Sequence, residues 1–539
     1  MKKVSRNYTA YIKGVFLPTV IYGGFTGFVT GCVIFLFHYI ADLVINLSYD
    51  IYSAVPENLW LLPVIFIGLI VLALLSYLIT KKAPNARGVG IPRSQGVIRG
   101  LLPMKWLKEF AATFAGSLMT LIAGVPLGVE GPSVFLGTTI GGGISKLPFV
   151  KISYSRYLMT CGSGAGFAAS CKAPLTALLF SLEELNRKMS PMFITLALTA
   201  VVFSSVTTEL LSGLFGEPHA FFTLGEMSEL NISDIWVPVM CGIAAGLCAY
   251  LFNTVVGAIG KLSIKKTGEI WEFVKIVSVF ILSGIFALLL SDSVHHGGNL
   301  INGIIQMKYS VSVMLILLGV KFLLVPLAAS SGAVGGIFIP VLSIGAILGG
   351  LLSALSAQLG LSAVYSSGVI IITVAAFMAG TMQVPLTAVV FIMESTHSFD
   401  NALFVIIAVF LSYSTMRCFR AESIYDVILE RMVKDYRKNK KTKVYRCDYT
   451  IPDGSFAEGK LIGDLFWPQG TIVRLVESKQ TARMDSEGNH KLDAGDKLLL
   501  QFETCDLDQT IIDITSLIGG GEPENLRETS FVSNLSSGT

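Results

Sequence analysis

The chain has 539 residues, of which 53% are hydrophobic and only 14% are charged, and its formal net charge is +3. Soluble domains carry about 25% charged residues, so this composition excludes a single soluble globular core. The small net charge excludes a strongly acidic or basic protein, and the apolar surplus places most of the chain in a lipid bilayer.

Apolar segments recur along the chain, at lengths close to the roughly 20 residues that a membrane-spanning helix needs. They lie near residues 17–38, 59–79, 191–212, 235–258, 272–291, 313–328 and 402–416. Segments this numerous cannot share one soluble core, because each requires apolar surroundings on all sides. The chain is therefore predicted to be an all-α, multi-pass membrane protein.

Basic residues flank these segments on one side of the membrane. They gather before the first segment, after the second and after the last, at Lys2, Lys3, Arg6, Lys13, Lys81, Lys82, Arg87, Arg93 and throughout 431–446. Because Lys and Arg concentrate in cytoplasmic loops, we expect both termini to be cytoplasmic in a protein of the cell membrane. Residues 431–452 are predicted to be a basic linker near anionic headgroups, not a nucleic-acid-binding patch.

A glycine-rich run, Gly128-Val-Glu-Gly-Pro132, opens an apolar stretch and places one carboxylate, Glu130, inside it. Proline is favoured in the first turn of a helix, so Glu130 is expected at a helix start. Ionisable residues within membrane segments are functional by default. The alternative is a carboxylate that only caps the helix.

An internal repeat relates two halves of the membrane region. Ala173-Pro-Leu-Thr-Ala-Leu-Leu-Phe-Ser-Leu-Glu183 matches Val384-Pro-Leu-Thr-Ala-Val-Val-Phe-Ile-Met-Glu394, and a second glycine-rich run at 332–340 precedes the second copy. Two halves with glycine-interrupted segments in corresponding places predict a substrate site between broken helices. For the matched pair Glu183 and Glu394, packing or an interhelical hydrogen bond stays open beside a transport role.

These helix starts suit an anion. The N-terminus of a helix offers unpaired N–H groups and about half a positive charge, so it binds an anion without a basic side chain. Glycine lets the backbone approach an ion closely, and apolar side chains exclude water. A carboxylate at the same place, Glu130, would compete with the anion, and its protonation would release it.

Several short motifs resemble those of the CLC family of chloride channels and proton-coupled anion exchangers, over about residues 15–430. They are Gly88-Val-Gly-Ile-Pro92, the run at 128–132, Gly335-Gly-Ile-Phe-Ile-Pro340 and Ser423-Ile-Tyr-Asp426, in the family's order. The resemblance implies the CLC fold for residues 1–430, with two inverted-topology repeats. It also implies a homodimer in which each subunit has its own pathway for chloride and protons.

The resemblance assigns roles to individual residues. Glu130 matches the external gating glutamate, and Glu184 matches the internal proton glutamate of the exchangers. The groups expected around the anion belong to Val89, Gly90, Ile337, Phe338 and Tyr425. For Glu184 the alternative is a solvated helix end beside Arg187 and Lys188.

Two departures from the family pattern bear on the transported ion. Val89 stands where the family has a serine whose hydroxyl touches the central anion, and Val129 stands where an arginine is usual. A missing hydrogen-bond donor beside a dehydrated anion is costly, so chloride, fluoride and nitrate stay open as substrates. Pro132 and Tyr425 follow the chloride pattern.

Beyond the last apolar segment, short strand-like runs at 471–476 and 497–502 are separated by Gly and Asp turn signals. The runs Leu461-Ile-Gly-Asp-Leu-Phe-Trp467 and Leu492-Asp-Ala-Gly-Asp496 resemble the C-terminal subdomain of potassium-uptake regulators, the RCK_C or TrkA-C type. For residues 453–518 this implies a small cytoplasmic α+β domain. Residues 519–539 are predicted to be a disordered tail.

The second resemblance also implies a ligand. Modules of this type dimerise and bind a small molecule, cyclic di-AMP among them, and Ile472, Val473 and Arg474 are the candidate contacts. A nucleotide bound there would bias transport through the 431–446 stretch by binding one transport state better than another. The alternative is a domain that only stabilises the dimer.

Three function classes follow. Glu130 and Glu184 together favour a proton-coupled anion exchanger for chloride, or for fluoride, over a passive voltage- or ligand-gated channel. A signalling receptor is disfavoured, because the anion site keeps all its parts except the serine. No nucleophile-base or metal-ligand constellation points to an enzyme, and no cofactor is expected apart from the regulatory ligand.

Overall fold

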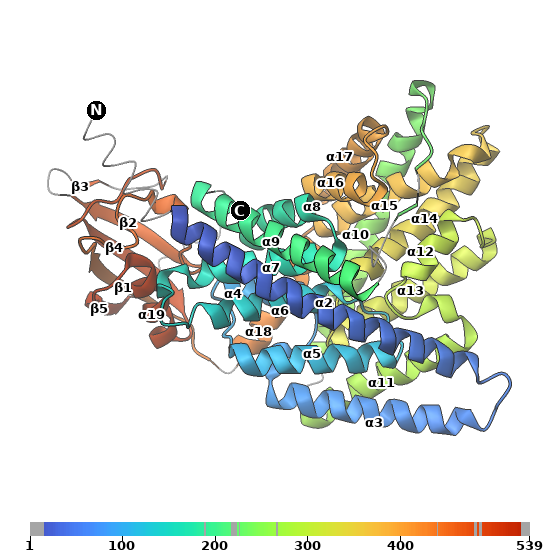
Figure 1. Cartoon of the computed structure of the whole chain (residues 1–539), viewed down its shortest axis with the longest axis horizontal. Coiled ribbons are helices and arrows are strands. Elements are labelled where there is room, and N and C mark those ends of the chain that lie inside the picture. The colour runs from blue at the N-terminus through green and yellow to red at the C-terminus, as the bar shows by residue number, and fades with distance from the viewer. Residues whose placement is uncertain are drawn as a thin grey trace.

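The computed structural model describes residues 16–187, 190–216, 224–225, 227–265, 268–438, 440–478, 482–483 and 488–529. Helices fill the chain as far as residue 437, and a small sheet follows (Figure 1). The basic residues at positions 2–13 and the last residues of the predicted tail, 530–539, lie outside the described ranges.

The first half of the membrane domain comprises α2 to α9. The helices are α2 (Leu17–Ser53), α3 (Leu61–Lys82), α4 (Gly90–Ile98), α5 (Trp106–Ile122), α6 (Glu130–Ile144), α7 (Ser155–Cys171), α8 (Pro174–Phe180) and α9 (Pro191–Phe215). A π-helical turn, Ser181–Asn186, continues α8.

The second half comprises α10 to α17, and α18 leads out of it. The helices are α10 (Trp236–Lys265), α11 (Glu269–Leu289), α12 (Gly298–Ile305), α13 (Val311–Ser331), α14 (Phe338–Gln358), α15 (Ser366–Met382), α16 (Pro385–Thr396), α17 (Ala402–Cys418) and α18 (Ile424–Arg437). Within the described residues, eight helices are long and apolar enough to cross a membrane, which agrees with a multi-pass chain.

The two halves repeat their packing. In the first half α2 packs against α7 and α9, and α6 packs against α7; in the second half α10 packs against α15 and α17, and α14 against α15. A reciprocal contact joins the halves. The Glu183 carboxylate accepts hydrogen bonds from the Leu386 and Thr387 amides and the Thr387 hydroxyl, and Glu394 accepts the same set from Leu175 and Thr176.

This contact identifies what the matched glutamates do. Each carboxylate lies at the first turn of the other half's helix, where amides lack partners within the helix. The interhelical hydrogen bond expected as one alternative is therefore confirmed. Because the end of each repeated segment meets the start of the other, α8 and α16 run antiparallel, which agrees with the inverted repeat that the family resemblance implies.

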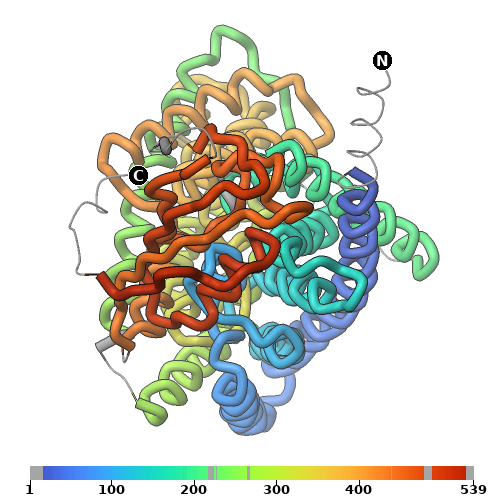
Figure 2. Tube along the Cα trace, turned by 90° about the vertical axis from the view of Figure 1, so that its left-hand side faces the viewer, coloured from blue at the N-terminus to red at the C-terminus, as the bar shows by residue number. Residues whose placement is uncertain are grey.

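The C-terminal domain is a five-stranded antiparallel sheet in the order β3-β2-β4-β1-β5. Its elements are β1 (Lys443–Thr450), β2 (Thr471–Glu477), β3 (Ala482–Arg483), β4 (Lys497–Thr504), α19 (Leu507–Ile518) and β5 (Glu524–Thr529). Alternate residues of β4, including Leu498, Leu500 and Phe502, pack in one core with Ile514 and Ile518 of α19. Figure 2 shows this sheet lying across one end of the helix bundle.

Two predicted boundaries were wrong. Residues 431–452 are not a free linker, because α18 continues to Arg437 and β1 begins at Lys443. β1 forms because its residues Val444, Cys447 and Tyr449 are buried in the sheet. The described part of the tail is not disordered either, since β5 pairs with β1. Its residues are mostly exposed, and main-chain hydrogen bonds hold them as an edge strand.

Candidate functional site

The starts of α4, α6 and α14 meet in the interior of the membrane domain. Main-chain hydrogen bonds hold them together: the Gly90 amide donates to the Gly335 carbonyl at 3.2 Å, and Gly128 and Gly336 exchange two hydrogen bonds of 2.7 and 2.8 Å. Helix starts are where backbone amides lack acceptors within the helix. The fold therefore gathers three helix starts at one buried place.

Glycine is required for this convergence. A Cβ atom on Gly131 would lie 2.6 Å from the Cα atom of Gly336, and a Cβ atom on Gly128 would collide with the Glu130 carboxylate. The glycine-rich runs that the sequence shows at two helix starts thus serve close backbone approach. Helix packing uses glycine in the same way elsewhere in the domain, since a Cβ atom on Gly137 of α6 would collide with the Gly162 carbonyl of α7.

Glu130 is the first residue of α6, and its side chain is 1% exposed. Its carboxylate lies near its own amide and near the amide of Ile339, in the first turn of α14. The Oε2 atom has no hydrogen-bond partner among the described residues. The carboxylate of one half therefore lies on the helix start of the other half, where a free anion would also bind.

The other residues predicted around the anion are buried at the same place. Val89 caps the start of α4, Ile337 and Phe338 form the start of α14, and all three are fully buried. Tyr425 lies in the first turn of α18, which packs against α4 and α15. Its hydroxyl is 3.6 Å from the Sδ atom of Met382, at the end of α15.

Glu184 lies on the π-helical turn after α8, a type of turn that often accompanies functional sites. The alternative of a solvated helix end is wrong, because the Glu184 side chain is 1% exposed. Its Oε1 atom accepts a hydrogen bond of 2.5 Å from Gln95 Nε2, and its Oε2 atom is 3.6 Å from Arg187 Nη2. The Glu184 carboxylate is therefore buried and is held by an amide and a guanidinium.

A cluster of polar side chains surrounds Glu184, and the sequence alone did not predict it. Arg99 Nη2 donates to the Glu184 carbonyl oxygen at 3.1 Å, and Arg99 Nη1 is 3.4 Å from Asp426 Oδ1. Asp426 also pairs with Arg187 at 2.7 Å. One signal could have found part of this group: Gln95 and Arg99 are four residues apart on α4 and so share a helix face.

α4 links the two carboxylates. Its start bonds to the glycine loop beside Glu130, and its end carries Gln95 and Arg99, which contact Glu184. The helix has 9 residues, and at 1.5 Å rise per residue it is about 13 Å long. The two predicted proton carboxylates therefore lie at opposite ends of one short buried helix.

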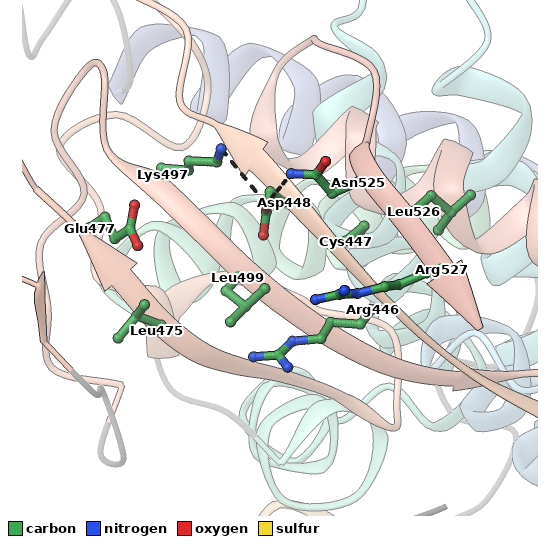
Figure 3. A pocket seen from close by; sticks show the side chains of 10 residues that line it. All are labelled: Arg446, Cys447, Asp448, Leu475, Glu477, Lys497, Leu499, Asn525, Leu526 and Arg527. Carbon is green, nitrogen blue, oxygen red and sulfur yellow. Dashed lines mark hydrogen bonds and ion pairs between the residues drawn. The ribbon is translucent and has the colours of Figure 1, made fainter. Parts of the chain in front are cut away.

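The C-terminal domain carries a second candidate site, a pocket of about 640 Å³ on the open face of its sheet (Figure 3). Arg446 of β1 and Arg527 of β5 are directly paired there, and Figure 3 shows their side chains side by side. The other lining residues are Cys447, Asp448, Leu475, Glu477, Lys497, Leu499, Asn525 and Leu526. Like charges in direct register destabilise a sheet, so this pair suits an anionic ligand.

The predicted ligand contacts lie beside this pocket and do not line it. Ile472 pairs with Gln501 on the open face, and Arg474 Nε donates to the Gln501 side chain at 3.2 Å. Val473 packs against the core of the domain, so it does not face that surface. Among the residues that the structure describes, no cluster of His, Cys, Asp and Glu could hold a metal ion.

Comparison with known proteins covers most of the membrane domain. The family model described as voltage gated chloride channel matches residues 67–417. The chain is 29% identical over 423 residues to the H(+)/Cl(-) exchange transporter ClcA of Salmonella arizonae, which covers 77% of this chain and 89% of that protein. It is 28% identical over the same length to ClcA of Salmonella paratyphi B, with the same coverage.

Solved structures share the fold. A slow cyanobacterial Cl-/H+ antiporter superposes with a TM-score of 0.71 at 23% identity, over 77% of this chain and 98% of that one. A CLC-type fluoride/proton antiporter superposes with a TM-score of 0.62 at 21% identity, over 76% and 98%. The family match ends at residue 417, before Tyr425 and the C-terminal sheet.

Proposed function

Because the chain belongs to the voltage-gated chloride channel family, we propose that it is a proton-coupled chloride exchanger and not a passive channel. It is a multi-pass membrane transport protein and not an enzyme. The observation that carries the proposal is the pair of buried carboxylates, Glu130 and Glu184, at the two ends of α4. A passive pore needs no buried proton acceptor at its inner end, whereas an exchanger needs one.

Glu130 gates the anion path by competing with the anion. When ionised, its carboxylate is attracted to the amides and the positive end of the helix dipole at the start of α14. Protonation removes the charge that these amides hold, so the side chain leaves and an anion takes its place. One proton bound at Glu130 therefore opens one position for chloride.

Glu184 supplies the proton from the other end of α4. Its burial keeps the carboxylate out of bulk water, and Gln95 and Arg187 orient its two oxygens. The proton crosses about 13 Å, the length of α4, while the anion uses the helix starts and the Tyr425 hydroxyl. The two ions would then share the outer site at Glu130 and take separate routes from there to the inner side.

We also propose an oligomeric state, a cellular membrane and an orientation for the protein. The protein works as a homodimer in the cell membrane, with one chloride and proton pathway in each subunit and with both termini cytoplasmic. These features rest on the family resemblance and on the placement of basic residues.

Proteoliposomes that contain the full chain test the exchanger. Anion flux and internal pH are recorded together in chloride, fluoride and nitrate, and we expect proton movement opposite to chloride. The Glu130→Gln variant mimics the protonated gate, so anion flux should persist while proton movement stops. Absence of proton movement in all three anions would establish a channel instead. Because Val89 offers no hydroxyl to the anion, proton coupling in fluoride alone would identify a fluoride exchanger.

We further propose that the C-terminal domain is an RCK_C-type regulatory domain and binds a cyclic dinucleotide such as cyclic di-AMP. Arg446 and Arg527 can each bind a phosphate through their planar donor forks, and Arg446 Nε lacks a partner among the described residues. The pocket volume of about 640 Å³ suits a ligand of this size. Leu475 and Leu499 provide an apolar floor for a base.

Calorimetry on the purified full chain tests the ligand. Cyclic di-AMP should bind, and the Arg446→Gln and Arg527→Gln variants should each bind at least about tenfold more weakly, because each loses a hydrogen bond between charged groups. Ile472→Ala serves as the control, because Ile472 lies beside the pocket and carries no charge. No heat at millimolar ligand would contradict the proposal.

A further inference from the structure

The C-terminal domain touches the inner end of α4, the helix that links the two carboxylates. The Gln469 amide donates a hydrogen bond of 2.9 Å to the carbonyl of Arg99. The last carbonyls of a helix have no donor within the helix, so a residue of the C-terminal domain completes the end of α4. The same Arg99 holds the Glu184 carbonyl and Asp426 with its side chain.

Phe466 anchors this contact in the membrane domain. Its ring stacks on Tyr157 of α7, with centroids 3.9 Å apart and planes 12° from parallel, and meets Phe193 of α9 edge-on at 5.4 Å. The Phe466 side chain is buried in a cluster formed mainly by membrane-domain residues. Phe466 thus lies in the C-terminal domain by sequence, but its side chain packs in the membrane domain.

Arg156 of α7 ties the same loop to α4 from a second direction. Its Nη1 atom lies 3.5 Å from the Ile98 carbonyl and 3.4 Å from the Phe466 carbonyl, and its Nη2 atom pairs with Asp513 of α19 at 2.6 Å. A guanidinium is a planar fork of donors, so the positions of Phe466 and Asp513 set the orientation of Arg156. That orientation in turn fixes the last turn of α4.

The start of α4 is held independently. Gly90 bonds to Gly335 of the second half, and this contact involves no residue of the C-terminal domain. Release of the domain would therefore remove the Gln469 hydrogen bond from the end of α4 that contacts Glu184, while the bond between Gly90 and Gly335 stays in place. The loop also continues into β2, which carries the pocket residue Leu475.

We propose that residues 465–469, the α4 clamp, position the internal proton glutamate, so that docking of the C-terminal domain sets how many protons move per chloride. Phe466 and Arg99 are positioning residues in this scheme, because they act through Glu184. The inference rests on the proposed function, since it requires that Glu184 handles the proton. A ligand on the open face of the sheet would act by moving β2 and, with it, the clamp.

The test uses the full chain in proteoliposomes, with chloride flux and proton flux recorded together. In the Phe466→Ala variant the protons moved per chloride should fall at least about twofold, because loss of an aromatic pair shifts the docking equilibrium of the C-terminal domain by at least about that factor. Phe466→Tyr keeps the stacked ring and should restore the ratio. Ile472→Ala is the control, because Ile472 lies on the open face of the sheet and makes no aromatic contact with the membrane domain, and it should leave the ratio unchanged.

Arg99→Gln provides a second variant that leaves the C-terminal domain intact, and it should lower the ratio in the same direction. Equal falls of both fluxes in Phe466→Ala, or an unchanged ratio in Phe466→Ala and Arg99→Gln, would overturn the α4 clamp. Glu184→Ala separates the two proposals. Proton transport that survives in Glu184→Ala contradicts the exchanger mechanism, whereas its loss there with an unchanged ratio in Phe466→Ala contradicts the α4 clamp alone.

Discussion

Glu183 and Glu394 occupy matching positions in the two halves of the membrane domain, and each carboxylate caps a helix of the opposite half. The next residue breaks the match, because Glu184 in the first half corresponds to Ser395 in the second. The helix starts differ in the same way: α6 begins at Glu130 and α14 begins at Phe338. The glutamates present in both halves, Glu183 and Glu394, join the halves. The glutamates present in the first half only, Glu130 and Glu184, are those assigned to proton transfer.

This difference has a physical basis. A junction between two inverted halves uses the same contact twice, so the same residue serves in both. A pathway with an outer and an inner proton step needs a different group at each end. Glu130 also lies near the Ile339 amide, so a carboxylate of the first half faces a helix start of the second half, which has no carboxylate there.

The largest effect on proton transport should come from Glu184, whose counterpart in the second half, Ser395, is not a carboxylate. Glu184→Ala removes the buried proton acceptor, so proton movement should cease while chloride flux continues. Ser395→Ala changes the corresponding residue of the second half and should leave both fluxes as they are. Simultaneous pH and chloride recording in proteoliposomes checks both variants. Loss of coupling in Ser395→Ala would break the comparison between the halves.

Val89 at the start of α4 should affect how tightly the anion binds. Val89→Ser places a hydroxyl at the start of α4, and a hydrogen bond to a charged group contributes about 1.5–3 kcal/mol. The chloride concentration that gives half-maximal flux should fall at least about tenfold, since 1.4 kcal/mol corresponds to that factor. Chloride flux into proteoliposomes at a series of chloride concentrations measures it. Val89→Ala removes both methyl groups without adding a hydroxyl, and an equal change there would exclude the hydrogen bond as the cause.

Much of the membrane domain could be predicted because its signals are local. Apolar length predicts the spans, and glycine with proline marks the helix starts that hold Glu130 and Phe338. The group around Glu184 could not be predicted in this way. Gln95, Arg99 and Asp426 come from two helices that lie far apart in the sequence, and no spacing rule connects them.

The C-terminal boundaries failed for a different reason. β1 and β5 carry many charged residues, and alternation along β1 is interrupted by a register shift near Arg446 and Asp448. A polar edge strand is held by main-chain pairing, which leaves no hydrophobic pattern to read. The docking of Phe466 on Tyr157 was equally hidden, because an aromatic residue in a loop gives no indication of the domain it packs against.

The smallest expected effect comes from the matched pair. Glu183→Ala and Glu394→Ala each remove hydrogen bonds to two amides and one hydroxyl at a helix start. Loss of such a cap lowers the free energy of unfolding by about 0.5–2 kcal/mol, and the two losses should be similar because the contacts are the same. Thermal unfolding of the detergent-solubilised protein measures them.

The proton-to-chloride ratio of these two variants tests whether Glu183 and Glu394 only join the halves or also take part in transport. If the matched glutamates only join the halves, both variants keep the wild-type ratio, and their destabilisations do not simply add, because α8 and α16 share one junction. An altered ratio in either variant, or a loss confined to one of them, would show that equivalent positions in the two halves have taken different roles. The assignment of transport chemistry to unmatched carboxylates would then lose its basis, even if Glu184→Ala abolished coupling.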